Sequence, residues 1–165
     1  GTGGQMVEVQ DRQEGAGVVM KLNEDGTVTL TTAMVEMGPG EHETLAAYAA
    51  EHLKIDISKV YVEAGNTQTA PFDMGTHASR GTYVGGLAVL AAAEEMKRQI
   101  IRKAAEMIEA PAEELVIMDG KIWHPDRPER YVTFADVAMR YKTRNGFLPI
   151  VVSGMRPNAA PPSWT

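Results

Sequence analysis

The sequence predicts an α/β or α+β fold, in which a mixed β-sheet with β-hairpins and one βαβ-type unit packs against two main helices. Three observations favour this fold class. Asp-Gly turns separate two pairs of apolar segments, a strand–helix–strand succession occurs once, and one long helix is apolar throughout its first half. The 165 residues suit one domain, which can bury about 70% of the surface of its unfolded chain.

A β-hairpin and a crossover unit are expected in the first half of the chain. Apolar residues alternate over 18–22, the chain turns at Asp25-Gly26, and the alternation resumes from Val28 to Val35. A helix with an apolar inner side is expected from Glu41 to near Lys54, followed by a strand over Lys59–Ala64. Strand, helix and strand in this order imply a βαβ-type unit.

Two glycines just before this helix predict an anion-binding turn. Gly38 and Gly40 lack the Cβ atoms that would keep a ligand away from the backbone. Free N–H groups at a helix start, together with the positive end of the helix dipole, favour phosphate or carboxylate. Most glycine turns before helices are only connectors, and that alternative stays open here.

A second turn of this kind is expected before the longest helix. The segment 65–82 has little apolar periodicity, and loops of this length in a compact domain tend to be functional. Its small and hydroxyl residues over Thr76–Thr82 suit a polyanion that also reaches the first turn. The simpler alternative is that Ser79 or Thr82 only caps the helix.

The longest helix is expected to run to Glu109. Its first half, 83–93, is apolar all round and should be buried on every side, with Gly85 and Gly86 admitting another backbone. A small domain covers such a helix with difficulty, which suggests neighbours outside this chain. Both ends of the chain also look cut, so we interpret it as a piece of a longer polypeptide.

The remaining sequence predicts a second hairpin, a helix and a last strand. The expected elements are a helical turn at Pro111, strands over 115–118 and 121–124 around Asp119-Gly120, a loop over 125–128, a helix capped by Thr133, and a strand over 148–152. We therefore divide the chain into a poorly defined N-terminal stretch over 1–17, a domain over 18–157, and a truncated linker or loop over 158–165.

Composition argues against several classes of function. The formal charge of −6, with dispersed basic residues, argues against nucleic-acid binding, and no apolar run approaches the roughly 20 residues of a membrane span. The absence of cysteine excludes iron–sulfur ligation and zinc–thiolate sites within this chain. Without a signal peptide, a cytoplasmic location is expected. The four histidines lack metal-ligand spacing, so neither a metal site nor a complete catalytic set is predicted.

Six motifs, in this order, carry a resemblance to a known family. They are Thr27-Val28-Thr29-Leu30, Met37-Gly38-Pro39-Gly40-Glu41-His42-Glu43-Thr44, Ala49-Ala50-Glu51-His52-Leu53-Lys54-Ile55, Gly65-Asn66-Thr67, Ala78-Ser79-Arg80 and Gly86-Leu87-Ala88-Val89. Together they resemble the molybdenum-binding subunit of the xanthine dehydrogenase and aldehyde oxidase family. The resemblance runs in register from about Val18 to Ile101 and continues more weakly over 133–157. It implies a fold like that of a molybdopterin-binding domain.

This resemblance also implies an activity and its cofactors. Members of the family hydroxylate aldehydes or N-heterocycles such as purines, with water as the oxygen source and molybdenum held by molybdopterin. Bacterial members often carry the cytosine dinucleotide form. Because the cofactor ligates the metal, protein metal ligands are not needed. Iron–sulfur and flavin groups would lie on other domains or subunits, and the remaining partner would be a small-molecule substrate.

Residue by residue, the resemblance assigns cofactor contacts but no catalytic residue to this chain. The expected contacts are Met37, Gly38, Pro39, Gly40, Thr76, Ala78, Ser79 and Arg80, the last by charge to phosphate. The family usually has glutamine at Pro39, and proline has neither that side-chain amide nor a backbone N–H. The catalytic glutamate of the family lies in a glycine-rich motif that is absent from this sequence. It is expected on missing parts of the same subunit, which would leave the isolated piece inactive.

The alternative is a stand-alone, non-catalytic α/β interaction or assembly domain with structural glycine turns. Such a domain should be stable by itself and show no exposed apolar patch. The fragment interpretation instead predicts exposed apolar surface around Val84–Ala93. The burial of residues along this stretch therefore helps to distinguish the fragment from the stand-alone domain.

Overall fold

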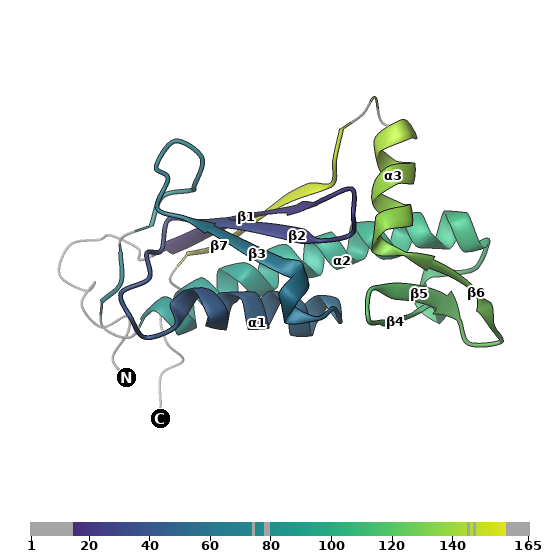
Figure 1. The fold of residues 1–165 in the computed structure, drawn as a ribbon, viewed down its shortest axis with the longest axis horizontal. Coiled ribbons are helices and arrows are strands. Elements are labelled where there is room, and N and C mark those ends of the chain that lie inside the picture. Colours follow the sequence, from purple (N-terminus) through teal and green to yellow (C-terminus); the bar gives the residue numbers. More distant parts are fainter. Residues whose placement is uncertain (1–14, 74, 78–79, 145, 147, 158–165) are drawn as a thin grey trace.

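The computed structural model describes residues 15–73, 75–77, 80–144, 146 and 148–157. Within these residues the chain forms two β-sheets and three α-helices, as the sequence predicts for the fold class. Helix α2 (Gly86–Ile108) runs beneath the main sheet and continues to the second sheet, so it joins the two parts of the molecule (Figure 1). Of the predicted terminal stretches, 1–14 and 158–165 lie outside the described residues.

The main sheet is mixed and has the strand order β3-β2-β1-β7. Its strands are β1 (Gly15–Leu22), β2 (Val28–Thr32), β3 (Val60–Ala64) and β7 (Val151–Pro157). β1 pairs antiparallel with β2 and with β7, whereas β2 and β3 are parallel. The predicted first hairpin is confirmed, and Gly26 in its turn has a φ of 85°, which disfavours most other residues.

The core lies between this sheet and two helices. Helix α1 (Glu41–Leu53) connects the parallel strands β2 and β3, which confirms the predicted βαβ-type unit. α1 and α2 cover the same face of the sheet (Figure 1). Alternate strand residues such as Met20 and Leu30 point to that face and are fully buried, as are Leu45 and Val89 on the helices. Each such side chain contributes roughly 1.5–3 kcal/mol by leaving water.

The first half of α2 is covered on its sheet side rather than all round. Tyr83 and Ala91 are exposed, because the sheet and α1 cover adjoining sides of the helix and leave the third side open. The apolar residues that face the core are buried: Val84, Ala88, Val89, Ala92 and Ala93. The expectation of burial on every side was therefore wrong. The open side carries apolar residues, since Ala91 is exposed and Leu87 and Leu90 are half-buried, so part of the apolar surface expected around Val84–Ala93 is exposed.

Glycines set the closest packing around α2. Gly85 and Gly86 admit side chains rather than another backbone, because their missing Cβ atoms leave room for Met34 and Tyr48. The close backbone approach is made by Gly154 of β7 instead. A Cβ atom there would overlap with the α2 backbone, so this strand can reach the helix only with glycine.

The second sheet is antiparallel, has the order β4-β5-β6, and lies against the far end of α2 (Figure 1). Its strands are β4 (Val116–Met118), β5 (Lys121–His124) and β6 (Arg127–Thr133). The predicted second hairpin is confirmed. The loop expected over 125–128 was too long, because β6 already starts at Arg127. The side chains at the start of β6 are exposed and mostly polar, so the alternation that would reveal a strand is missing.

The last helix and the strand ends show how far local patterns reach. Helix α3 (Phe134–Arg144) starts where predicted: the Asp136 N–H donates to the Thr133 hydroxyl at 3.1 Å, and the Thr133 N–H donates to the Asp136 carboxylate at 2.8 Å. β2 ends at Thr32 rather than Val35, and β7 starts at Val151, so it overlaps only the end of the strand expected over 148–152. No helix in the described ranges is long and apolar enough to cross a membrane.

Candidate functional site

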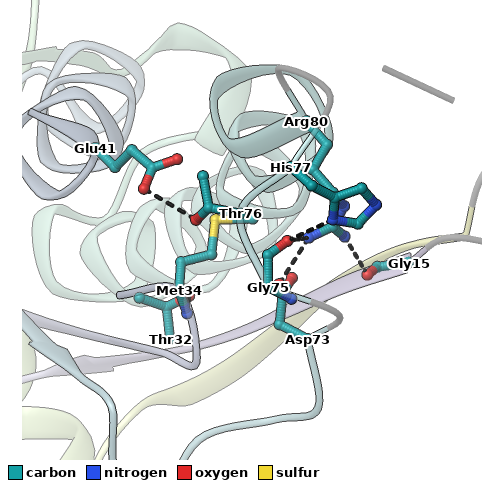
Figure 2. Close-up of polar contacts among 9 residues, drawn as sticks. All are labelled: Gly15, Thr32, Met34, Glu41, Asp73, Gly75, Thr76, His77 and Arg80. Carbon is teal, nitrogen blue, oxygen red and sulfur yellow. Dashed lines mark hydrogen bonds and ion pairs between the residues drawn. The ribbon is translucent and has the colours of Figure 1, made fainter. Parts of the chain in front are cut away.

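The two segments predicted to bind a ligand leave the main sheet at the same edge. Because β2 and β3 are parallel, the residues after Thr32 and those after Ala64 start from neighbouring carboxyl ends. Ligands of α/β sheets commonly bind outside such ends. Figure 2 shows the two segments meeting there, with Glu41 from the first beside Thr76 from the second.

The turn before α1 has the form of an anion-binding site, and the chain's own Glu36 fills it. Gly38 and Gly40 have φ angles of 108° and 78°. The Glu36 carboxylate accepts hydrogen bonds from the N–H groups of Gly38 at 2.6 Å, Gly40 at 3.0 Å and His42 at 3.2 Å. Desolvation raises the pKa of Glu36, but these backbone hydrogen bonds together hold it below its ordinary value. Another anion would have to displace Glu36 or approach from elsewhere.

The solvent side of this turn is open. Met37 is 61% exposed, Pro39 is exposed, and a Cβ atom added at Gly38 would have no atom within 4 Å. Pro39 has no backbone N–H, so it adds no hydrogen-bond donor to those of Gly38, Gly40 and His42. The turn therefore offers backbone atoms, a proline ring and a flexible apolar side chain to a ligand.

Arg80, the predicted phosphate contact, points into the protein. Its side chain is fully buried, and Nη1 forms an ion pair with the buried Asp73 at 2.7 Å. Nη1 and Nη2 also donate to the carbonyl oxygens of Gly75 at 2.9 Å and Gly15 at 2.6 Å (Figure 2). In the described part of the chain, Arg80 Nε and Asp73 Oδ2 have no hydrogen-bond partner. The guanidinium thus holds the loop against the start of β1, and Asp73 balances its charge.

The start of α2 is linked directly to the start of α1. A π-helical turn (Gly81–Gly85) precedes α2, and such turns are frequent at functional sites. The Thr76 hydroxyl donates to Glu41 Oε2 at 3.0 Å, and Glu41 Oε1 lies in the space that a Cβ atom at Gly81 would need. The two predicted turns are therefore parts of one structure.

The two segments predicted from the sequence lie side by side, but the side chains that hold them were not predicted. The turn 37–40 and Thr76 come to one sheet edge, whereas Ala78 and Ser79 lie outside the described residues. The missed side chains are three carboxylates: Glu36, Glu41 and Asp73. Glu36 had a local signal, since an acceptor two residues before a glycine turn often bonds the backbone. The partners of the other two come from distant or irregular sequence, which gives no such signal.

The histidines do not gather at this edge as metal ligands. His42 Nε2 lies 3.0 Å from a backbone carbonyl oxygen, while His52 and His124 pair with Glu94 at 2.6 Å and Glu114 at 2.8 Å. Nowhere in the described ranges do three His, Asp or Glu side chains converge to hold a metal ion. A metal bound here would need ligands from a cofactor or from other segments.

Comparison with known proteins identifies the family. Residues 1–157 match the molybdopterin cofactor-binding domain. The chain belongs to this family. The molybdopterin cofactor-binding domain seen here is 32% identical over 153 residues to the putative xanthine dehydrogenase molybdenum-binding subunit of Escherichia coli. It is 33% identical over 120 residues to the nicotine 6-hydroxylase large subunit of Paenarthrobacter nicotinovorans.

These relatives are much longer than the chain. The two alignments cover 90% and 73% of the domain but only 20% and 15% of those proteins, so the chain spans at most about a fifth of their length. Among solved structures, quinoline 2-oxidoreductase from Pseudomonas putida matches with a TM-score of 0.73 and 26% identity, over 87% of this chain and 19% of that one. The resemblance and the fold class predicted from sequence are both confirmed.

Proposed function

We propose that this molybdopterin cofactor-binding domain forms part of the cofactor cradle of a molybdenum hydroxylase, which oxidises an aldehyde or an N-heterocycle such as a purine, with water as oxygen source. The observation that carries the proposal is the meeting of the turn before α1 and the loop before α2 at one sheet edge. These are the segments whose sequences resemble the cofactor contacts of the family.

The residues at this edge fit an organic cofactor held by backbone groups and small side chains. Gly38 and Gly75 both have positive φ angles and open space where a Cβ would be, so a planar group can approach the chain closely. When bound, molybdopterin supplies the molybdenum ion and its redox chemistry. The chain itself would orient the cofactor and shield it from water. The cytosine dinucleotide form, part of the same proposal, would extend the phosphate contacts.

The proposed contacts differ in how they act. The segment Met37–Gly40 would pack against the cofactor through its backbone and the exposed Met37 side chain. Thr76, Ala78 and Ser79 would form the second wall. Arg80 would support that wall from the protein interior rather than reach a phosphate, because its guanidinium is held by Asp73 and two carbonyl groups.

Segments outside this chain would complete the enzyme. The rest of the subunit would provide the catalytic glutamate and the substrate funnel, and iron–sulfur and flavin domains or subunits would carry electrons away. Xanthine, nicotine and quinoline appear in the names of the three relatives, which favours an N-heterocycle, although carbon monoxide dehydrogenase large chains match as well. A cytoplasmic location and the boundaries of the domain at 18 and 157 belong to the same proposal.

The test uses the full-length protein that contains this domain, purified from a molybdenum-replete host. Its molybdenum content and the pterin and cytidine nucleotide released by acid are measured. Gly38→Val should lower all three quantities, because the added side chain fills the open side of the turn. Gly146→Val is the matched control, since Gly146 also has a positive φ of 66° and open space around it but follows α3. Wild-type protein with neither molybdenum nor pterin would overturn the proposal.

A further inference from the structure

We propose that Glu41 is a positioning residue that locks the two walls of the cradle, represented by residues 37–40 and 75–77, in a single arrangement. The inference rests on the proposed function and concerns how firmly the cofactor is held. Glu41 does not contact the cofactor in this scheme. It acts through Thr76 and through the start of α2.

The burial of this carboxylate is unusual for its position. Carboxylates in the first turn of a helix are normally at the surface, where they interact with the helix dipole, and Glu43 in the same turn is exposed. Glu41 is only 7% exposed. Burying a carboxylate is costly unless hydrogen bonds and favourable charge compensate it. The sequence thus keeps a carboxylate where an apolar side chain would be less costly.

Three segments converge on this one side chain. Its backbone directly follows Gly40, so it starts α1 from the first wall. Its Oε2 accepts a hydrogen bond from the Thr76 hydroxyl at 3.0 Å, across 35 residues of sequence (Figure 2). Its Oε1 occupies the space that a Cβ atom at Gly81 would need. A glycine at 81 is therefore needed for the carboxylate to lie between the helix starts.

The contact is separate from the other support of the second wall. Arg80 and Asp73 tie the loop to the start of β1, on the side away from α1. Within the described residues, the hydrogen bond from Thr76 to Glu41 links the two walls to each other. A ligand that touches both walls is held tightly only if their separation is fixed, because displacement by about 1 Å weakens contacts at both ends.

The experiment measures how fast the cofactor leaves the full-length holoprotein. Glu41→Gln keeps the size and an acceptor oxygen but removes the charge that strengthens the hydrogen bond from Thr76. Loss of molybdenum and pterin on dilution should be about tenfold faster in this variant than in wild type. Thr76→Val should have a similar effect, and combining both should add little, since they break the same contact. Glu43→Gln is the control, because it removes one charge from the same helical turn without touching the loop.

The outcomes separate this inference from the proposed function. If wild type retains cofactor but Glu41→Gln and Thr76→Val release it no faster than Glu43→Gln, the positioning role is overturned. It is also overturned if the variants lower the melting temperature equally with and without cofactor while the release rate stays unchanged, because that is a purely structural effect. If Glu41→Gln fails to fold, Gly81→Ala decides instead, because its methyl group displaces the Glu41 carboxylate without altering a proposed cofactor contact. Wild type that never holds cofactor overturns the proposed function instead.

Discussion

Helices α1 and α3 begin in opposite ways, and the difference distinguishes the candidate site from the rest of the fold. At α3, Thr133 and Asp136 cap each other, so the donors of the first turn are satisfied locally. At α1 the N-cap is Gly40, which has no side chain, and the carboxylate of Glu36 reaches in from the preceding turn. A reciprocal cap closes a helix start, whereas a glycine turn capped from upstream leaves one side open to a ligand.

Charges are also handled differently in the two regions. At the cradle, Asp73 and Arg80 are fully buried as an ion pair. Where α3 meets the first hairpin, Lys142 and Glu24 pair at 2.8 Å with both side chains partly exposed. Buried charges fix geometry because they tolerate little displacement, while exposed pairs are screened by water. The following variants test this contrast, in order of expected effect.

The largest effect is expected from Asp73→Ala. Removing this carboxylate leaves the Arg80 charge buried without its partner, which should lower the free energy of unfolding by about 3–5 kcal/mol. The exposed counterpart, Glu24→Gln, should cost far less, because water screens the pair. Denaturant unfolding of both variants measures the difference. Equal losses would show that the buried pair has no special role at this edge.

A smaller effect is expected from Gly81→Ala, which places a methyl group where the Glu41 carboxylate lies. The overlap should cost about 1–3 kcal/mol. Adding Glu41→Ala should relieve part of that cost. The double variant should therefore lose less free energy of unfolding than the two single variants lose together. A double-mutant cycle by thermal or denaturant unfolding checks this. Strict additivity would mean that the two residues do not share the space.

Thr133→Ala should cost about 1 kcal/mol, the usual value for a lost N-cap. The cap lies at α3, far from the cradle, so cofactor content of the full-length protein should remain at the wild-type level. A melting curve and a molybdenum determination on the same sample give both quantities. Loss of cofactor in this variant would contradict the separation of the two helix starts.

The smallest effect is expected from acid. The pKa of Glu36 lies below its ordinary value, so its carboxylate contribution to stability is fully present at neutral pH and is lost as pH falls through that lowered pKa. The protection of the amides of Gly38, Gly40 and His42, measured against their intrinsic exchange rates at each pH, should therefore fall in this acidic range. Hydrogen exchange followed by NMR would detect it. In Glu36→Gln the exchange should be fast already at neutral pH, and protection equal to wild type would rule out the carboxylate as the acceptor.

Local sequence patterns predicted most of the fold because neighbouring residues determine them. The Asp-Gly turns, the strand–helix–strand succession and the Thr133 cap each depend on residues within a few positions of one another. β6 was partly missed because an exposed edge strand with polar side chains has no alternation to detect. The distribution of the strands over two sheets was also not predictable, since it depends on pairing between distant segments.

By itself, the sequence determined the family of this protein and marked the two segments that we propose as cofactor contacts, because glycine positions and motif order are local properties of the chain. The tertiary structure decided which partners the charged side chains of those segments contact. Glu36 occupies the first turn, Asp73 takes the charge of Arg80, and Glu41 is buried between the helix starts. These pairings join residues that only the fold brings together, and in a buried, low-dielectric setting proximity decides which charge meets which partner.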